Sequence, residues 1–555
     1  MVLRTRLSRA VAVPLAAALV LTACSSAGTD EPESAAVQTS DPDAVLTVIA
    51  EEHDRDASVA TSRALFDAAP LVVVAASGDA AGQELSARAA IGLGVPLLIA
   101  PAAGATGAAA ATTEAADPAL SDELERLSAT TALLVGAVAP LPEEGGDSSM
   151  AIERVAATAG ALGDATGLTL GAPTAPDAAR FAAGIAGFEH GAPQRDAPQP
   201  GAVPRPEPAE PLADTVALAV DAVDQLAPIA TARAAGVPVH LVPATAPNPQ
   251  ATPSAIDALH ASTATRTLAL GAAFGAEPAL EWKVRAARGG FQLPGGGQLL
   301  FPRHQFVALY GTPSTSALGV LGEQDASGSV QRAREVAAPF EALTDRTVVP
   351  MFEVIATVAA GGAGPDGNYS NELPVESLRP LVEAAADAGI YVVLDLQPGR
   401  TDFLTQAQQY RSLLELPNVG LALDPEWRLE PDEVHLRQIG SVTAEEVNSV
   451  VTWLADLTNE QGLPQKMLVL HQFRLDMITD RHALDLSRPE LAVLVHVDGL
   501  GTQGAKQATW AALLRDAPEG LHWGWKNFYD EDEPMLTPEQ TMRGVTPAPD
   551  LVTYQ

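Results

Sequence analysis

Acidic, imidazole and indole side chains recur in the second half of this 555-residue chain, at the points where apolar runs stop. They are Asp395 and Gln397, Asp424 and Glu426, His471, His496 and Asp498, and Trp523, Trp525 and Lys526. Side chains alternate along a strand with a period of two, so the two members of each pair point to the same face. The pattern predicts a polar site built from the ends of several strands.

Two carboxylates can act as acid and base when one of them is held in a less polar place and its pKa rises, and indoles offer flat apolar surfaces for sugar rings. We therefore expect a glycoside-hydrolase-like activity or sugar recognition, with Glu426 as the proton donor and Asp424 or Asp395 as the second carboxylate. No cofactor is expected. The expected substrate-binding residues are Trp427, Trp523, Trp525, Lys526, His471, His496, Asp498, Gln397, Glu353 and Tyr310.

The same residue types are compatible with two other functions. Histidine and carboxylate side chains are also divalent-metal ligands, so a metal-assisted phosphodiesterase could use His471, His496, Asp498, Asp424 and Glu426. The chain has no His-x-His or His-Glu-x-x-His spacing to support a metal site, and none is expected. In the third alternative, the protein binds wall glycan without catalysis.

The elements that position these residues alternate between apolar strands and amphipathic helices, which over residues 304–545 predicts a (β/α) TIM-like barrel. Seven strands are expected, one fewer than a closed barrel of this type needs. They are 306–310, 348–356, 391–396, 419–423, 467–473, 491–497 and 521–528. Helices are expected at 330–343, 375–388, 403–414, 444–459 and 506–514.

Residues 58–290 contain a strand-helix-strand-helix-strand order twice, which predicts duplicated parallel, Rossmann-like α/β units. The strands of the first copy are expected at 71–75, 96–100 and 131–136, and those of the second at 215–219, 237–242 and 266–271. Between the copies, the proline-rich stretch 192–211 is typical of an exposed linker.

The first copy carries Ser77-Gly-Asp79 after its first strand and Gly94-Val-Pro-Leu-Leu98 at its second. These runs resemble the cell-wall-binding repeats of the second type in Gram-positive surface proteins, which implies binding to cell-wall polymer. The closing turns depart from that pattern as Gly136-Ala and Gly271-Ala, and the second copy lacks Ser-Gly-Asp. Only two copies are found where the family uses three.

The second half resembles a family of uncharacterised actinobacterial surface proteins over most of residues 304–545. The resemblance lies in Val392-Val-Leu-Asp-Leu-Gln-Pro-Gly-Arg-Thr-Asp-Phe403, Leu423-Asp-Pro-Glu-Trp427 and His522-Trp-Gly-Trp-Lys-Asn-Phe528. It implies an actinobacterial-type envelope and supports the domain boundary, but it brings no known chemistry.

The amino terminus has the three parts of a secretory signal: arginines, an apolar run over 11–21, and small residues before Cys24. The run is shorter than the roughly 20 residues that cross a bilayer. Leu21-Thr-Ala-Cys24 resembles the lipobox of bacterial lipoproteins, which implies cleavage before Cys24 and lipidation of its sulfur. Residues 25–57 are then expected to form a disordered tether to the outer face of the cell membrane.

The formal net charge of −36 argues against nucleic acid as a partner, because phosphate contacts need clustered lysine and arginine. It also argues against adsorption to anionic lipid, so the expected membrane contact depends on the acyl chains at Cys24. Cys24 is the only cysteine of the chain, which excludes an internal disulfide and a thiolate metal cluster.

Overall fold

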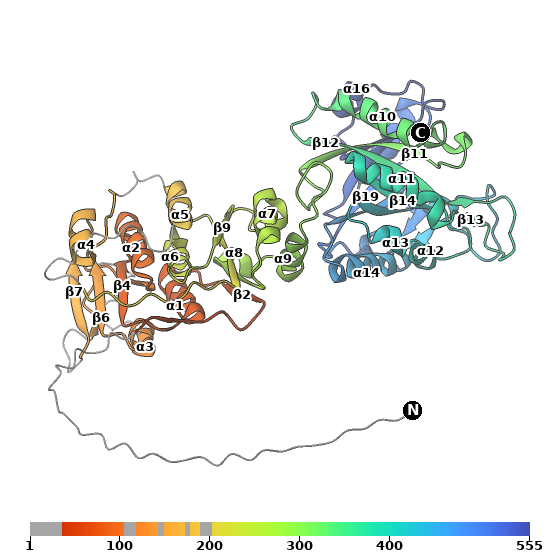
Figure 1. Cartoon of the computed structure of the whole chain (residues 1–555). Coiled ribbons are helices and arrows are strands. Elements are labelled where there is room, and N and C mark those ends of the chain that lie inside the picture. The colour runs from red at the N-terminus through yellow and green to blue at the C-terminus, as the bar shows by residue number, and fades with distance from the viewer. Residues whose placement is uncertain (1–35, 105–117, 143–148, 173–177, 189–202) are drawn as a thin grey trace, which may run out of the picture.

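A computed structural model of the chain describes residues 36–104, 118–142, 149–172, 178–188 and 203–555. Figure 1 shows a mixed α/β first half in red to green and a barrel-containing second half in green to blue. Within the described residues, no helix has the length and apolar character needed to cross a membrane.

The first α/β unit is a parallel four-stranded sheet in the order β5-β4-β6-β7. All residues of its central strands are buried, which explains their unbroken apolar sequences. The strands are β4 (Leu71–Ala76), β5 (Leu97–Ala100), β6 (Thr131–Val135) and β7 (Ala151–Val155). The helices are α2 (Ala80–Leu93), α3 (Pro118–Arg126), α4 (Ala159–Thr166) and α5 (Ala178–Ala186).

The second unit is a parallel sheet in the order β2-β10-β8-β9. Its strands β9-β8-β10 repeat the arrangement β5-β4-β6, as expected of a duplicated unit. The strands are β2 (Leu46–Ile49), β8 (Thr215–Val220), β9 (Val239–Val242) and β10 (Arg266–Leu270). The helices are α6 (Leu226–Ala234), α7 (Pro253–Ala261), α8 (Ala272–Gly275) and α9 (Leu280–Gly289).

The expected disordered tether is wrong for residues 38–57. The short strand β1 (Gln38–Thr39) pairs with β3 (Phe66–Ala68), and β2 adds an edge strand to the second sheet beside β10. Helix α1 (Asp54–Leu65) then packs against α6 and β5. The segment is short of apolar residues by itself, but pairing with a preformed sheet edge satisfies its backbone.

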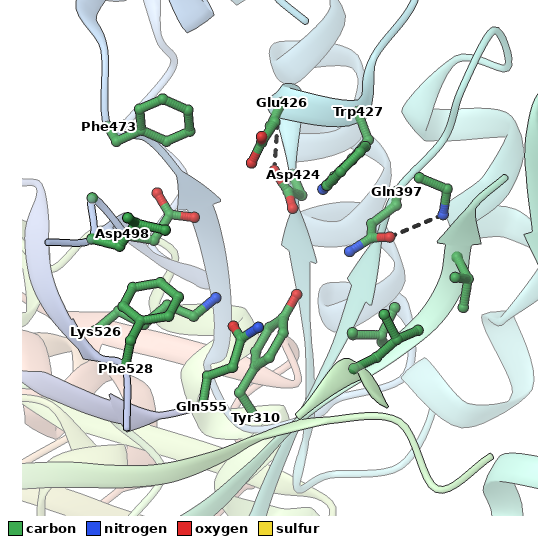
Figure 2. A pocket seen from close by; sticks show the side chains of 16 residues that line it. Tyr310, Gln397, Asp424, Glu426, Trp427, Phe473, Asp498, Lys526, Phe528 and Gln555 are labelled. Carbon is green, nitrogen blue, oxygen red and sulfur yellow. Dashed lines mark hydrogen bonds between the residues drawn. The ribbon is translucent and has the colours of Figure 1, made fainter. Parts of the chain in front are cut away.

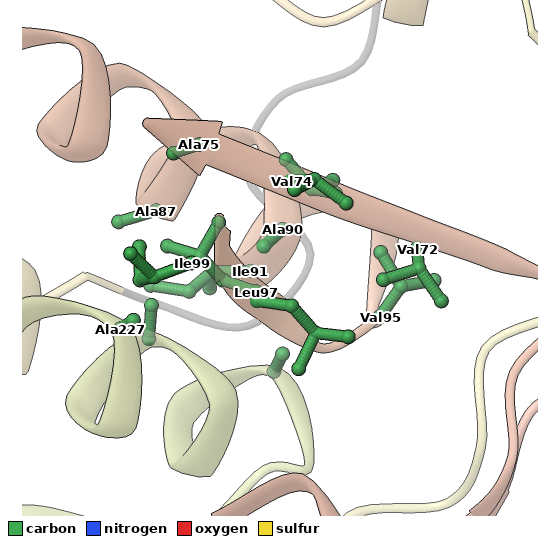
Figure 3. Close-up of a cluster of buried hydrophobic side chains, with 14 of the residues drawn as sticks. Val72, Val74, Ala75, Ala87, Ala90, Ile91, Val95, Leu97, Ile99 and Ala227 are labelled. Carbon is green, nitrogen blue, oxygen red and sulfur yellow. The ribbon is translucent and has the colours of Figure 1, made fainter. Parts of the chain in front are cut away.

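The two units share one hydrophobic core. In Figure 3, Ala227 of α6 lies beside Ile99 and Leu97 of β5, with Val74 and Ala90 on the other side of the cluster. Small side chains let the helices approach the sheet closely, which explains the alanine content of this half. Of the expected linker, residues 192–202 lie outside the described part, and residues 203–211 have no helix or strand, with Val203 buried.

The second half forms a closed barrel of eight parallel strands, confirming a TIM-like architecture. The order is β11-β21-β20-β19-β17-β15-β14-β12, and β12 pairs with β11 to close the ring. The strands are β11 (His304–Gly311), β12 (Thr347–Ala359), β14 (Tyr391–Leu396), β15 (Val419–Leu423), β17 (Lys466–His471), β19 (Leu491–Val497), β20 (His522–Asn527) and β21 (Leu551–Tyr554).

The expectation of seven strands missed β21, which lies beyond residue 545 and closes the ring between β11 and β20. Two further short strand pairs lie in the loops at the carboxyl ends of the barrel strands. They are β13 (Ser370–Glu372) with β12, and β16 (Val442–Thr443) with β18 (Ile478–Thr479). The outer helices are α10 (Ala326–Ala337), α11 (Val375–Ala388), α12 (Phe403–Gln409), α13 (Arg411–Leu414), α14 (Ala444–Glu460), α15 (Gln503–Leu514) and α16 (Pro538–Gly544).

The interior of the barrel is apolar at the end where its strands begin. Side chains such as Phe306, Met351, Tyr391, Met467 and Leu494 form one cluster there. Leu293, Leu300 and Phe301 of the preceding connection join this cluster and cover that end of the barrel. The interior can therefore open only toward the carboxyl ends of the strands.

Candidate active site

A cavity of about 380 Å³ lies at the carboxyl ends of the barrel strands. Figure 2 shows Glu426, Asp424 and Trp427 along one wall, with Asp498, Phe473, Phe528 and Lys526 facing them. Its lining combines charged, amide and apolar groups: Tyr310, Leu318, Ile355, Val358, Ala359, Gln397, Asp424, Glu426, Trp427, Phe473, Asp498, Gly499, Leu500, Lys526, Phe528 and Gln555.

Alternation along the strands creates the polar floor of this cavity. On β11, β12 and β14, the inward apolar residues Phe306, Met351 and Val393 are followed two or four positions later by inward polar ones. The other strands of the barrel also change from inward apolar to inward polar residues. One layer of polar side chains therefore lies above the apolar cluster that fills the other end of the barrel. This layer contains Tyr310, Glu353, Asp395, Asp424, His471, His496, Lys526 and Thr553.

His471 is the centre of a buried ionic network. Its Nε2 lies 2.8 Å from Glu353 Oε1 and 3.8 Å from Asp395 Oδ1, and its Nδ1 lies 3.0 Å from Asp498 Oδ2. Burial alone would lower the pKa of His471, but the negative charges of Asp395 and Glu353 and the hydrogen bonds to Asp498 and Glu353 raise it well above its usual value. His471 is therefore an imidazolium that donates from both ring nitrogens.

His496 differs from His471 in charge. Its Nδ1 lies 3.2 Å from the same Glu353 oxygen, and its Nε2 is buried without a hydrogen-bond partner in the described structure. Burial lowers the pKa of His496, so its ring is neutral at neutral pH and donates from Nδ1. Gly524 makes room for this ring, since a Cβ there would lie 3.1 Å from His496 Cδ2.

Glu353, His471 and His496 bring three potential metal-ligand atoms within 4.8 Å of one another. Both imidazoles are already hydrogen-bonded to one Glu353 oxygen, and the other oxygen accepts from Thr553 Oγ1 at 3.2 Å. Hydrogen bonding thus accounts for the arrangement. None of the three lines the cavity, so the structure places these predicted substrate-binding residues beneath it.

Tyr310, Asp395 and Lys526 form the other side of the floor. Tyr310 donates its hydroxyl hydrogen to Asp395 Oδ2 at 2.7 Å, and Lys526 Nζ lies 3.6 Å from the centre of the Tyr310 ring. Burial raises the pKa of Asp395 to about 6, although the charge of His471 opposes the rise. Asp395 is fully buried below the cavity and does not line it, so substrate would meet Tyr310 and Lys526 first.

Glu426 lies on a short 3-10 turn that follows β15, within Asp424-Pro-Glu-Trp427. Asp424 caps this turn by accepting from Glu426 N at 3.2 Å, and this bond holds the Asp424 carboxylate against the backbone of Glu426 at the cavity wall. Burial, followed by the charge of Asp498, raises the pKa of Glu426 to about 7. The pKa of Asp424 is raised well above its usual value, also mainly by burial.

Asp498 faces Glu426 across the cavity and carries the opposite shift (Figure 2). Burial alone would raise the pKa of Asp498, but the hydrogen bond from His471 and the charges of His471 and Lys526 hold it below its usual value. The cavity thus contains two neighbouring carboxyl groups with raised pKa values, Asp424 and Glu426, and one that is ionised, Asp498. Such a division is what acid–base catalysis by two carboxyl groups requires.

The aromatic surfaces of the cavity differ in part from those expected. Trp427 lines it, with its ring 5.4 Å from that of His435, and Gln397 lies beside it with its Oε1 accepting from Ala359 N. Phe473 and Phe528 also line the cavity and were not anticipated. The expected strands 467–473 and 521–528 include these two residues, whereas β17 ends at His471 and β20 at Asn527.

Trp523 and Trp525 do not line the cavity, and their predicted role as sugar platforms is wrong. They alternate with Lys526 along β20, so they point outward when Lys526 points inward. Both pack against Trp510 of α15, with ring centres 6.0 and 5.7 Å apart, and are 8% and 1% exposed. They belong to the core between the barrel and its helices.

Cys24, the predicted site of lipidation, lies outside the described residues.

Comparisons with known proteins give little further information. No family model matches the chain, and no curated protein matches it. Among solved structures, the chain is similar to Cwp6 from Clostridium difficile, with a TM-score of 0.29 and 10% sequence identity. The alignment covers 65% of this chain and 66% of that one.

Proposed function

We propose that the barrel hydrolyses a glycosidic bond, with Glu426 as the proton donor to the leaving oxygen. The observation that carries this proposal is the contrast between Glu426, whose pKa is raised to about 7, and the ionised Asp498 on the facing wall of one cavity. Glycosidases divide the work between two carboxyl groups in this way.

The other cavity residues fit this role. Trp427 offers an apolar face to a sugar ring, while Gln397 and Lys526 supply donors for its hydroxyl groups. Asp498 would serve as base or nucleophile, since its pKa keeps it ionised at neutral pH. His471 stays below the cavity and positions Asp498 through the 3.0 Å hydrogen bond.

Replacing Glu426 with glutamine tests the proposal. Glu426→Gln keeps the shape of the side chain but cannot donate the proton, so turnover of a wall-derived glycan mixture should fall by about 10²- to 10⁴-fold. Released reducing ends measure the turnover. Glu430→Gln is the matched control, because Glu430 lies exposed on the same loop outside the cavity and should leave the rate unchanged. An equal rate in Glu426→Gln would eliminate the hydrolase.

The envelope location is a separate part of the proposal. The signal-like amino terminus and the lipobox-like Leu21-Thr-Ala-Cys24 support acylation of Cys24 and attachment to the outer face of the membrane. We expect wild-type protein to enter the detergent phase on Triton X-114 partitioning, and Cys24→Ser to remain in the aqueous phase. Equal partitioning of the two would reject lipid anchoring.

A further inference from the structure

Large apolar side chains are exposed around the cavity mouth. Of the eight large apolar residues exposed in the described structure, five lie on four loops that follow β15, β17, β19 and β20. We call these five the apolar rim: Leu436 (87% exposed), Ile439 (37%), Leu475 (53%), Leu500 (57%) and Tyr529 (41%). The four strands are consecutive in the barrel, so their loops are neighbours.

Backbone and side-chain contacts join these loops. The loop with Ile439 is tied to the loop with Leu475 by the β16–β18 pair. Phe473 Cβ lies 3.6 Å from the position that a Cβ on Gly499 would take, next to Leu500. Gly501 N donates to Asp532 Oδ1 at 3.3 Å, which connects that loop to the one with Tyr529. The loops that carry the rim are therefore joined to one another from β15 to β20.

The rim continues into the cavity through Leu500, which lines the cavity and is also 57% exposed. The cavity wall beneath it is apolar as well, since it contains Phe473 and Phe528. If the polar part of a ligand binds near Glu426, the rest of the ligand would extend out of the cavity along this apolar surface. Exposed apolar side chains at the mouth of a site commonly mark a binding surface.

The charges around the rim restrict what can lie on it. Exposed acids outnumber exposed arginines on these loops: Glu430, Asp432, Asp476, Asp480, Asp530, Glu531 and Glu533 against Arg437 and Arg474. Arg474 is also paired with Asp476. An anionic surface or chain would be repelled here, whereas an uncharged hydrocarbon chain would not.

We infer that the substrate is an amphiphile, in which a sugar unit enters the cavity and an attached hydrocarbon chain lies over Leu500 and the rest of the apolar rim. This inference rests on the proposed glycan site, and it names the class of compound that the site takes as a sugar joined to an uncharged apolar chain. The polar residues that line the cavity hold the sugar, and the rim removes the chain from water.

Binding of n-alkyl β-D-glucosides tests the inference. Methyl, hexyl and octyl glucoside are titrated into the full-length protein by calorimetry, each below its micelle concentration. A fully buried methylene contributes about a fourfold gain in affinity, and the half-open rim should still give at least about a tenfold gain from methyl to octyl. No gain with chain length, or no binding of octyl glucoside, would overturn the inference.

Matched variants assign the gain to the rim. Leu500→Ser and Leu475→Ser should each reduce the gain at least threefold, while Phe291→Ser should keep it. Phe291 is 54% exposed, but it precedes the segment that covers the opposite end of the barrel. A gain that survives in Leu500→Ser contradicts the inference.

Two further measurements separate the inference from its competitors. Glu426→Gln should bind octyl glucoside with the wild-type gain. If wild-type protein shows this gain but turns over no glycan, the hydrolase is rejected and the amphiphile stands. Neutral phosphatidylcholine vesicles test a bilayer as the occupant. Sedimentation of the protein with vesicles that depends on Leu500, without a chain-length gain for glucosides, would show that the rim faces a membrane and would reject the amphiphile.

Discussion

Glu123 in the first half and Glu426 in the barrel are both acidic side chains removed from much of the solvent, but their surroundings differ. Glu123 accepts from Arg126, Arg63 and Ser62 at 2.6 to 2.9 Å. Burial alone would raise its pKa, but these hydrogen bonds lower the pKa below its usual value. Glu426 has no ion pair within the described structure, and its pKa rises to about 7.

The two regions surround their buried charges differently. In the open sheets of the first half, arginines neutralise the buried acid, which contributes to stability. In the closed barrel, the ends of eight strands surround one axis. Asp395, Asp424 and Asp498 therefore lie close together, with few cations near them. Carboxyl groups in such surroundings are available for proton transfer.

The largest expected effect comes from removing the imidazolium in the barrel. His471→Asn leaves Glu353, Asp395 and Asp498 near one another without the positive charge between them. Breaking a buried ionic network in this way costs about 3 to 5 kcal/mol of folding free energy, measured by urea unfolding. His482→Asn, at an exposed position of the same barrel, is the control. Equal unfolding midpoints would show that the network has no ionic role.

The same substitution, glutamate to glutamine, should have different effects on stability in the two regions. Glu123→Gln leaves two arginines without their carboxylate and should lower stability by about 1 to 3 kcal/mol while turnover stays unchanged. Glu426→Gln should not lower stability at all. A stability loss in Glu426→Gln that matches the loss in Glu123→Gln would mean that both acids are structural.

The third effect is smaller and depends on pH. The folded pKa of Glu426 lies above the ordinary value of 4.5, so the folded state holds its proton more tightly than the unfolded state does. This residue therefore lowers stability progressively as pH rises from about 4.5 to 7. Glu426→Gln should match wild type at pH 4 and exceed it at pH 8 in urea unfolding. The reverse order would contradict a raised pKa.

Much of the barrel could be predicted because its strands are apolar and its helices amphipathic. The strand β21 could not, since Leu551–Tyr554 is short and is recognisable only through its pairing with β11 and β20. Pairing of β2 with β10 joins residues more than 200 positions apart, and no local pattern shows it. Strand propensity is a property of a single segment of sequence. These two segments become strands because they pair with neighbouring strands, so their propensity alone does not reveal them.

Strand alternation predicts which side chains of the candidate site point into the barrel. The rule places Lys526 inside the barrel and Trp523 and Trp525 outside, but residue type led to grouping all three at the mouth. The depth of each residue was not predictable. His471 and Glu353 lie below the cavity and Glu426 beside it because of the turn geometry after β15 and the stagger of the strands.

The ionisation of Glu426 can be measured directly, and its role as proton donor depends on it. Carboxyl-13C NMR of glutamate-labelled protein, with Glu426→Gln to assign the resonance, gives the midpoint of its titration. A midpoint of about 7 is expected. A midpoint near the ordinary glutamate value of 4.5 would show that Glu426 is ionised at neutral pH and would contradict its role as proton donor.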